Sequence, residues 1–254
     1  MTSERAKAFI LPLVLLGALE IWARVVHLQS DSLAPPSGIL QALGQALADG
    51  SILAATRDTL FAAFVGLVVG GVIGLILGIA FGIFETLDRL MEVTVEAIRP
   101  IPSVALLPIA LIAIGFGYRM EIAIVAFACV WPILILSRAA VRDIEPRLME
   151  VARVLRLSPG QSVRSIVIPA ALPRIFVAGR LAAGIALIVA VTVEIAINPL
   201  GLGASIMLAQ QALRPDLMLA YLVWIGLLGY ALNAVLMAAQ RHLFGYAAVV
   251  EEPS

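Results

Sequence analysis

The chain has 254 residues, of which 62% are hydrophobic and 13% are charged, with no net charge and a mean hydropathy of +1.05. A water-facing surface cannot be built from so few polar residues, so the composition excludes a soluble domain and indicates a membrane protein. The balanced charge also gives no sign of nucleic-acid binding.

Residues that carry chemistry are scarce. Lys7 is the only lysine, so the chain has no P-loop, whose lysine reaches nucleotide phosphates, and no lysine suited to a Schiff base. His27, His242 and Cys129 are isolated, which gives neither metal-ligand spacing nor a disulfide framework. We therefore expect no metal and no cofactor in this chain, and any ATP that drives it to be hydrolysed by another subunit.

The first apolar segment, Ala8–Ala23, follows Arg5 and Lys7 and resembles a signal peptide. No cleavage site of small residues comes after it, so we expect a retained first transmembrane helix. Leu33–Asp58 follows, and its amphipathic stretch is expected to lie along the membrane interface.

The second span, Leu60–Phe84, is long enough to cross a bilayer core of about 30 Å. Small residues let neighbouring backbones approach closely in lipid. Glycine stands at every fourth position of this span, at Gly66, Gly70, Gly74, Gly78 and Gly82. The stripe indicates either close packing within the bundle or a helix that slides against its neighbours during transport.

Two further spans follow, Pro100–Tyr118 and Ile122–Ser137. Glu96 and Arg99 precede the third span on one helix face, where they either pair with each other or contact a partner or the inner mouth of a path. Prolines within these spans can kink them, provided that neighbouring helices or a cavity satisfy the freed carbonyl groups.

A polar, arginine-rich insert of residues 139–174 separates the fourth span from the fifth. Apolar residues with helical spacing follow Glu150, a Ser-Pro-Gly break covers residues 158–160, and a second amphipathic run ends at Ile168-Pro169. This pattern predicts a helix–turn–helix on the membrane surface, presented to a partner.

The fifth span runs as Leu181–Val193, is interrupted by Glu194 and continues to Leu200; the sixth is Leu217–Gln240. Glu194 follows Arg180 by roughly 20 Å along a helix, which places it in the outer half of the bilayer. A carboxylate there is costly unless it meets water, a partner or protons. It is either a structural hydrogen-bonding group or part of a path or gate.

Six spans make an all-α membrane protein with one domain over residues 1–254. Arginine and lysine concentrate on the side that holds the N-terminus and residues 139–174, and the positive-inside rule assigns this side to the cytoplasm. Both termini are then cytoplasmic.

The insert resembles the EAA loop of permeases of binding-protein-dependent ABC importers, in which E-A-A is followed after three residues by glycine and later by an apolar residue and L-P. Here the pattern reads Glu150-Val-Ala152, three residues, Arg156 and finally Ile168-Pro169, so arginine replaces the family glycine. Glycine would permit a positive φ at this turn or close packing against the partner, whereas arginine offers a charge. Other segments resemble the sulfonate, nitrate and taurine branch, namely Arg99–Pro108, Gly115–Gly117, Pro169–Pro173, Gly179-Arg180, and Glu194 followed by Gly201–Gly203.

The resemblance implies a type I importer permease in the inner membrane of a bacterium, surrounded by membrane lipid. Two permease subunits, expected as a homodimer, would form the path; two ATPase subunits would bind ATP and Mg²⁺; a binding protein would deliver the solute outside. Coupling to the ATPases would fall on Glu150, Ala152, Arg153, Leu155, Arg156, Leu157, Ser158 and Pro159, and a path or gate on Glu194, Arg99 and Arg180.

By resemblance, the solute is a small oxyanion such as a sulfonate, taurine or nitrate, with a thiamine precursor or an aromatic carboxylate as the alternative within the family. A self-contained secondary transporter that uses Glu194 as a proton site would belong to a different class. That class predicts inverted repeats, and we find no convincing repeat between the halves. A purely structural scaffold would explain the glycine stripe but not the loop.

Overall fold

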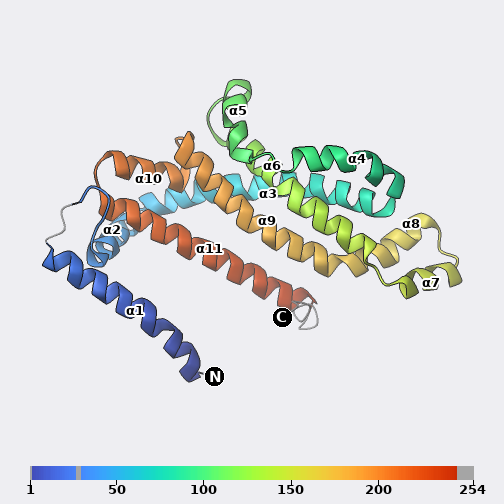
Figure 1. The fold of residues 1–254 in the computed structure, drawn as a ribbon, viewed down its shortest axis with the longest axis horizontal. Coiled ribbons are helices and arrows are strands. Elements are labelled where there is room, and N and C mark those ends of the chain that lie inside the picture. Colours follow the sequence, from blue (N-terminus) through green and yellow to red (C-terminus); the bar gives the residue numbers. More distant parts are fainter. Residues whose placement is uncertain (1, 27–29, 245–254) are drawn as a thin grey trace.

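The structure is a computed structural model that describes residues 2–26 and 30–244, and for residues 2–9, Met149 and Pro159 it describes the backbone alone. Within these ranges the chain forms helices and their connections, with no β-strand, and the long helices run side by side in an elongated bundle (Figure 1). The predicted all-α fold is confirmed. The side chains of Arg5 and Lys7 and the C-terminal residues 245–254, which bear on the predicted orientation, lie outside the described part.

The long helices are α1 (Thr2–Val25), α3 (Ser51–Ile83), α6 (Tyr118–Arg142), α9 (Ile168–Ala196) and α11 (Pro215–Phe244). Shorter helices connect them: α2 (Pro36–Ala48), α4 (Glu85–Ile98), α5 (Leu107–Ile114), α7 (Pro146–Val154), α8 (Pro159–Ser162) and α10 (Gly201–Gln211). A 3₁₀ turn, η1 (Ser103–Leu106), precedes α5, and a wide π-type turn, η2 (Val163–Val167), joins α8 to α9.

Helices α3 and α6 share the most extensive contact in the bundle, and the glycine stripe lies within it. A Cβ added at Gly70 would stand 2.2 Å from the carbonyl oxygen of Ala126, and one at Gly74 would stand 2.5 Å from that of Val130. Gly78 gives the same result against α6. The two backbones therefore touch with no side chain between them, as small residues allow in membrane bundles.

Helix α9 completes the central core by packing on both α3 and α6. It presents a row of buried alanines at intervals of four residues, Ala178, Ala182, Ala186 and Ala190, which again lets helices approach closely. The side chains of Met120, Ile124, Val125, Cys129 and Ile133 on α6 fill the space where the three helices meet.

A second cluster covers one end of the bundle, where α2 and α10 lie against α3 and α11. Ile52, Leu202 and Tyr221 are buried there together, and Trp224 Nε1 on α11 donates a hydrogen bond to Thr56 Oγ1 on α3 at 2.8 Å. Between α2 and α3, the Asp49 carboxylate accepts a hydrogen bond from the backbone N–H of Ser51, which lowers the pKa of Asp49.

Helix α1 stands apart from the bundle and is held chiefly through α2 (Figure 1). The carboxylate of Glu20 accepts hydrogen bonds from both the backbone N–H and the hydroxyl of Ser37, at 2.9 and 2.8 Å, and from Arg24 at 2.6 Å. The apolar side chains of α1 that the structure describes are largely exposed, as suits a helix surrounded by lipid.

The third predicted span, Pro100–Tyr118, is wrong as a continuous helix. The chain bends by 79° between α4 and the segment formed by η1 and α5. Helix α5 has eight residues, a length of about 12 Å, which cannot cross a bilayer core of about 30 Å. Pro100 and Pro102 account for the break, because each lacks a backbone donor and disfavours helix in the residue before it.

Four described segments are long and apolar enough to cross a membrane: α3, α6, Gly160–Gln211 and α11. The bent pair of α4 with η1 and α5 makes a fifth if it is counted as one span. The total of six spans remains a prediction, in which α1 is the sixth span.

The α3–α6 contact makes a prediction about stability. Gly70→Ala should lower the free energy of unfolding by about 1–3 kcal/mol, because the added methyl group overpacks a contact between two backbones. Gly71→Ala is the matched control on the same helix, since its Cβ would meet only the flexible end of Ile133 at 3.3 Å. Thermal unfolding of the two variants in detergent checks this, and equal stabilities would contradict the backbone contact.

Candidate functional site

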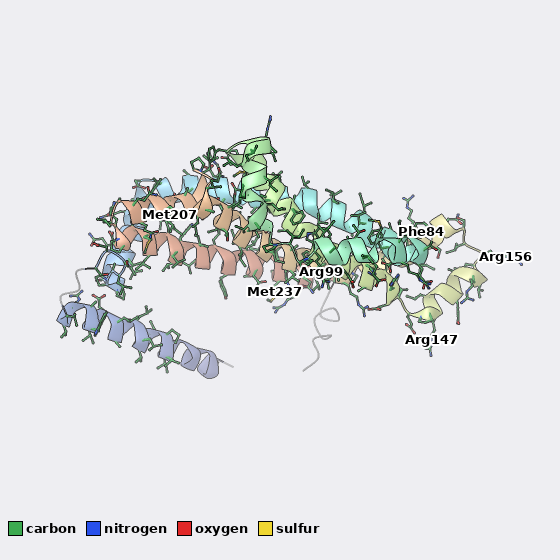
Figure 2. All side chains as sticks on the ribbon, turned by 45° about the horizontal axis from the view of Figure 1, so that its top comes forward. Phe84, Arg99, Arg147, Arg156, Met207 and Met237 are labelled. Atoms are coloured by element: carbon green, nitrogen blue, oxygen red, sulfur yellow. The ribbon has the colours of Figure 1, made fainter. Side chains whose placement is uncertain are left out.

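The predicted helix–turn–helix is present at one extreme end of the molecule. It consists of α7, a short turn, α8 and η2, and it leads directly into α9 (Figure 1). Arg147 and Arg156 mark this end, whereas Met207 on α10 lies at the opposite end (Figure 2).

The turn after α7 has the geometry for which the resemblance predicts glycine. Arg156 has a φ of +50°. Its backbone N–H bonds to the carbonyl of Arg153 at 3.1 Å, and the N–H of Leu157 bonds to that of Ala152 at 3.0 Å. This pair of bonds is a Schellman motif, which satisfies the last carbonyl groups of a helix around one left-handed residue. The arginine therefore adopts a left-handed conformation, which glycine adopts without penalty, at a strain of about 1–2 kcal/mol.

The start of α8 is fixed just as locally. The Ser158 hydroxyl accepts a hydrogen bond from the backbone N–H of Gln161 at 3.4 Å, and the Gln161 side chain accepts one from the N–H of Ser158 at 2.9 Å. This reciprocal arrangement is a capping box. The Ser-Pro-Gly break is thus the ordered beginning of a helix, and the whole turn is held by its own hydrogen bonds.

Helix α7 displays a mixed surface at its tip. Val154 is 81% exposed and Leu155 62% exposed, beside the exposed side chains of Glu150, Arg153 and Arg156. Ala152 is buried; Leu157 is half-buried and Ser158 is exposed, while the side chain of Pro159 lies outside the described part. An apolar patch with charged edges is typical of a protein–protein interface.

Ion pairs fasten this end of the bundle. Asp88 on α4 is buried and contacts the guanidinium groups of Arg138, at 2.8 Å, and of Arg142, at 2.5 Å, both on α6. Arg174 at the start of α9 pairs with Asp143 after α6 at 3.4 Å. The segment from α7 to η2 thus begins and ends at helices that ion pairs connect to each other or to an adjoining part of this chain.

Two buried carboxyl groups meet at the opposite end. Glu194 accepts a hydrogen bond from the backbone N–H of Gly203 at 2.8 Å, and Glu121 on α6 accepts one from the Asn198 side chain at 2.6 Å. The second oxygen of each carboxyl group, Oε1 of Glu121 and Oε1 of Glu194, is buried without a hydrogen-bond partner among the described residues.

The same network holds the first turn of α10. The N–H of Leu202 donates to Thr59 Oγ1 on α3 at 2.9 Å, so Thr59 and Glu194 together satisfy two of the free donors that begin every helix. Gly201 has a φ of +85°, and a Cβ there would stand 2.0 Å from Glu194 Oε1. The Gly-Leu-Gly segment therefore lies directly on the Glu194 carboxyl group.

The three residues assigned to a path or gate do not come together. Arg180 and Glu194 lie about 21 Å apart along α9. Arg180 donates a hydrogen bond to Gln240 on α11 at 3.2 Å. Arg99 is the exposed residue that ends α4, and no hydrogen bond or ion pair given for the described residues joins it to either of the other two.

The comparisons with known proteins identify the family. Residues 70–244 match the family of binding-protein-dependent transport system inner membrane components. The chain belongs to this family. The prediction of an importer permease is confirmed, as is a multi-pass membrane protein of the inner membrane.

Relatives place the permease in the predicted branch. It is 30% identical to the putative aliphatic sulfonates transport permease protein of Escherichia coli over 225 residues, which cover 89% of this chain and 86% of that protein. It is 28% identical to the taurine transport system permease protein of the same organism, covering 89% and 85%. The resemblance to the sulfonate, nitrate and taurine branch is therefore confirmed.

Solved structures support the fold. The methionine ABC transporter MetNI in inward-facing conformations aligns with a TM-score of 0.67 and 23% identity, covering 73% of this chain and 93% of that chain. An amino acid ABC transporter solved with histidines aligns with a TM-score of 0.66 and 16% identity, covering 79% and 98%. The type I importer permease fold is shared at these low identities.

Sequence reasoning missed half of the carboxyl network. The predicted fourth span begins at Ile122 and so excludes Glu121, whereas α6 begins at Tyr118 and buries Glu121 completely. The position of Glu121, an acidic residue in the first turn of an apolar helix, could have indicated a buried carboxyl group. Thr59 and Asn198 gave none, because their partners are 143 and 77 residues away in the chain.

The Gly201 contact is testable by comparing two glycines. Gly201→Ala should lower the free energy of unfolding by about 2–5 kcal/mol, from backbone strain plus the clash with Glu194. Gly115→Ala isolates the strain, because Gly115 has a φ of +84° with no atom near an added Cβ. Unfolding in detergent measures both, and a Gly201→Ala loss no larger than that of Gly115→Ala would contradict the contact.

Proposed function

We propose that this permease is the membrane half of an ATP-driven importer and that the α7–α8 turn is the site where each ATPase docks. The observation that carries the proposal is the exposed tip of α7, where Val154 and Leu155 are uncovered beside a turn held rigid by a Schellman motif and a capping box. A rigid, partly apolar projection is suited to a groove on another protein.

The connection from this turn into the bundle supports a coupling role. Helix α8, η2 and α9 follow one another without a break, so a displacement of the turn is transmitted to α9. Helix α9 packs on α6 and α3 and also lines a cavity with α11. In this mechanism ATP binding and the loaded binding protein shift the population between two packings of the helices.

The cargo we propose is a small oxyanion. The two relatives described above are named for the transport of aliphatic sulfonates and of taurine, which share a compact anionic group. A thiamine precursor or an aromatic carboxylate is the alternative. A self-contained secondary transporter that uses Glu194 is disfavoured by family membership and by the burial of Glu194 against α10.

The assembly we propose contains two copies of this chain, two ATPase subunits and one solute-binding protein. ATP and Mg²⁺ are bound by the ATPases, and this chain holds no cofactor. The turn and both termini face the cytoplasm, in line with the arginines around residues 138–174, and α10 faces the binding protein outside.

The docking role predicts a loss of coupling. Glu150→Arg should leave insertion intact, weaken co-purification of the ATPase at least tenfold and abolish uptake, because it makes the charged face of α7 wholly basic. Glu145→Arg is the matched control: Glu145 is also exposed, but it precedes α7 as its N-cap residue, at the end of the helix away from the turn. Normal transport and ATPase binding in Glu150→Arg would refute the docking role.

Arg156→Gly gives a complementary prediction. The left-handed conformation is free of strain for glycine, so the turn and the thermal stability of the protein should be kept or improved. ATPase binding should fall by less than in Glu150→Arg. A measured loss of stability on this substitution would contradict the Schellman geometry.

Orientation is tested by labelling single cysteines with an impermeant maleimide in a Cys129→Ala background. Gly160→Cys, in the exposed start of α8, should be labelled only after the cells are opened. Gln211→Cys, exposed at the end of α10, should be labelled in intact cells. The reverse pattern would overturn the assignment of sides.

A further inference from the structure

A cavity of about 390 Å³ lies between α9 and α11 and is not part of the coupling turn or the carboxyl network. Its lining is mostly apolar, with no acidic side chain. The lining residues are Arg180, Gly184, Leu187, Ile188, Val191, Thr192, Ile225, Gly226, Gly229, Tyr230, Leu232, Asn233 and Leu236.

Glycines from both helices create the hollow. A Cβ added at Gly184 or Gly226 would have no atom within 4 Å, and one at Gly229 would meet only Leu187 at 3.6 Å. These glycines therefore differ from those between α3 and α6, where an added Cβ would collide with the neighbouring helix. Here the missing side chains leave open space rather than close helix packing.

One positive charge stands at this cavity. Arg180 is half-buried and lies directly before the predicted fifth span, Leu181–Val193, about 18 Å along α9 from Ile168. Its hydrogen-bond partner is the neutral Gln240, and among the described residues no carboxylate lies within ion-pair distance of it. A charge left unneutralised at the edge of a membrane span is favoured where it faces water or an ion of opposite sign.

We propose that this cavity is the anion subsite of the translocation path and that Arg180 is the residue that admits the anionic group of the cargo. The glycine-lined hollow gives the cargo room, and Thr192, Tyr230 and Asn233 line the same cavity with polar groups. The inference rests on the proposed import function, and it names the residue that sets the charge preference of the path.

A single arginine suits a site of transit. One cation at a wide cavity attracts an anion without the several converging donors of a tight binding site, and a path must also release what it binds. Because Arg180 is on the helix that continues from the docking turn, movement of α9 would carry the charge with it.

The charge preference can be measured without knowing the cargo. Gly184→Cys, in a Cys129→Ala background, places one thiol in the cavity one helical turn from Arg180. In the assembled transporter, its reaction rate is measured with two thiol reagents of similar size, sulfonatoethyl methanethiosulfonate, which is anionic, and trimethylammonioethyl methanethiosulfonate, which is cationic. Each is measured with and without ATP.

We expect the ratio of anionic to cationic rates to fall by roughly 3- to 10-fold when Arg180→Gln is added, the effect of one nearby unit charge that water partly screens. Arg180→Lys should keep the ratio, because it keeps the charge. Gln240→Ala should also keep it, because it removes only the hydrogen bond of Arg180. An equal fall in Gln240→Ala would indicate a merely structural arginine and overturn the proposal.

Two further results would also overturn it. A ratio unchanged by Arg180→Gln means that the charge does not act on the cavity. A thiol at position 184 that reacts with neither reagent, with or without ATP, means that a second copy of the chain or lipid covers the cavity. Either of these results, together with normal ATPase co-purification and uptake, would contradict the anion subsite alone. Loss of both ATPase co-purification and uptake in the unsubstituted protein would instead contradict the proposed import function.

Discussion

Contact between the backbones of α3 and α6 is the constraint on which the bundle depends. At Gly70 and Gly74 the carbonyl groups of α6 occupy the space that a side chain would need. A contact this close has little freedom to slide, so the two helices behave as one body, and α9 packs across both. Relative motion during transport must then fall on less tightly packed contacts, such as the one between α9 and α11.

The charged groups follow the same division. At one end Asp88 is paired with two arginines of α6, and at the other Glu194 is held by the first turn of α10. Both carboxyl groups have partners within the bundle, although Asp88 Oδ1 and Glu194 Oε1 are buried without one, and these contacts connect helices at the two ends of the rigid body. Arg180 differs, because it lies at a cavity and has a neutral partner. The carboxylates of Asp88 and Glu194 thus stabilise the fold, whereas the guanidinium group of Arg180 is available to interact with a solute in the cavity.

Much of this arrangement could be predicted from the sequence, because its signals are local or periodic. The glycine stripe at intervals of four and the polar insert with its Ser-Pro-Gly break are of this kind. The third span was wrong as a continuous helix because hydropathy over Pro100–Tyr118 reports apolarity, not the break that its prolines impose. Glu121 and Thr59 were missed because their roles depend on partners brought together only by the fold.

Arg156 shows what local hydrogen bonds impose on a backbone. The two hydrogen bonds of the Schellman motif hold its φ at +50°, and the capping box at Ser158 follows directly. The sequence shows an arginine at this position, but only the φ angle shows that it adopts the left-handed conformation.

That tolerance separates the shape of the loop from its chemistry. A position whose conformation is imposed by its neighbours can exchange glycine for a large cation at a cost of about 1–2 kcal/mol, while the exposed side chain is free to diversify. Under the proposed docking role, in a cell that makes many importers of one architecture, such an exposed position would distinguish one permease from another. It would then be a single site at which the pairing of permease and ATPase could be altered.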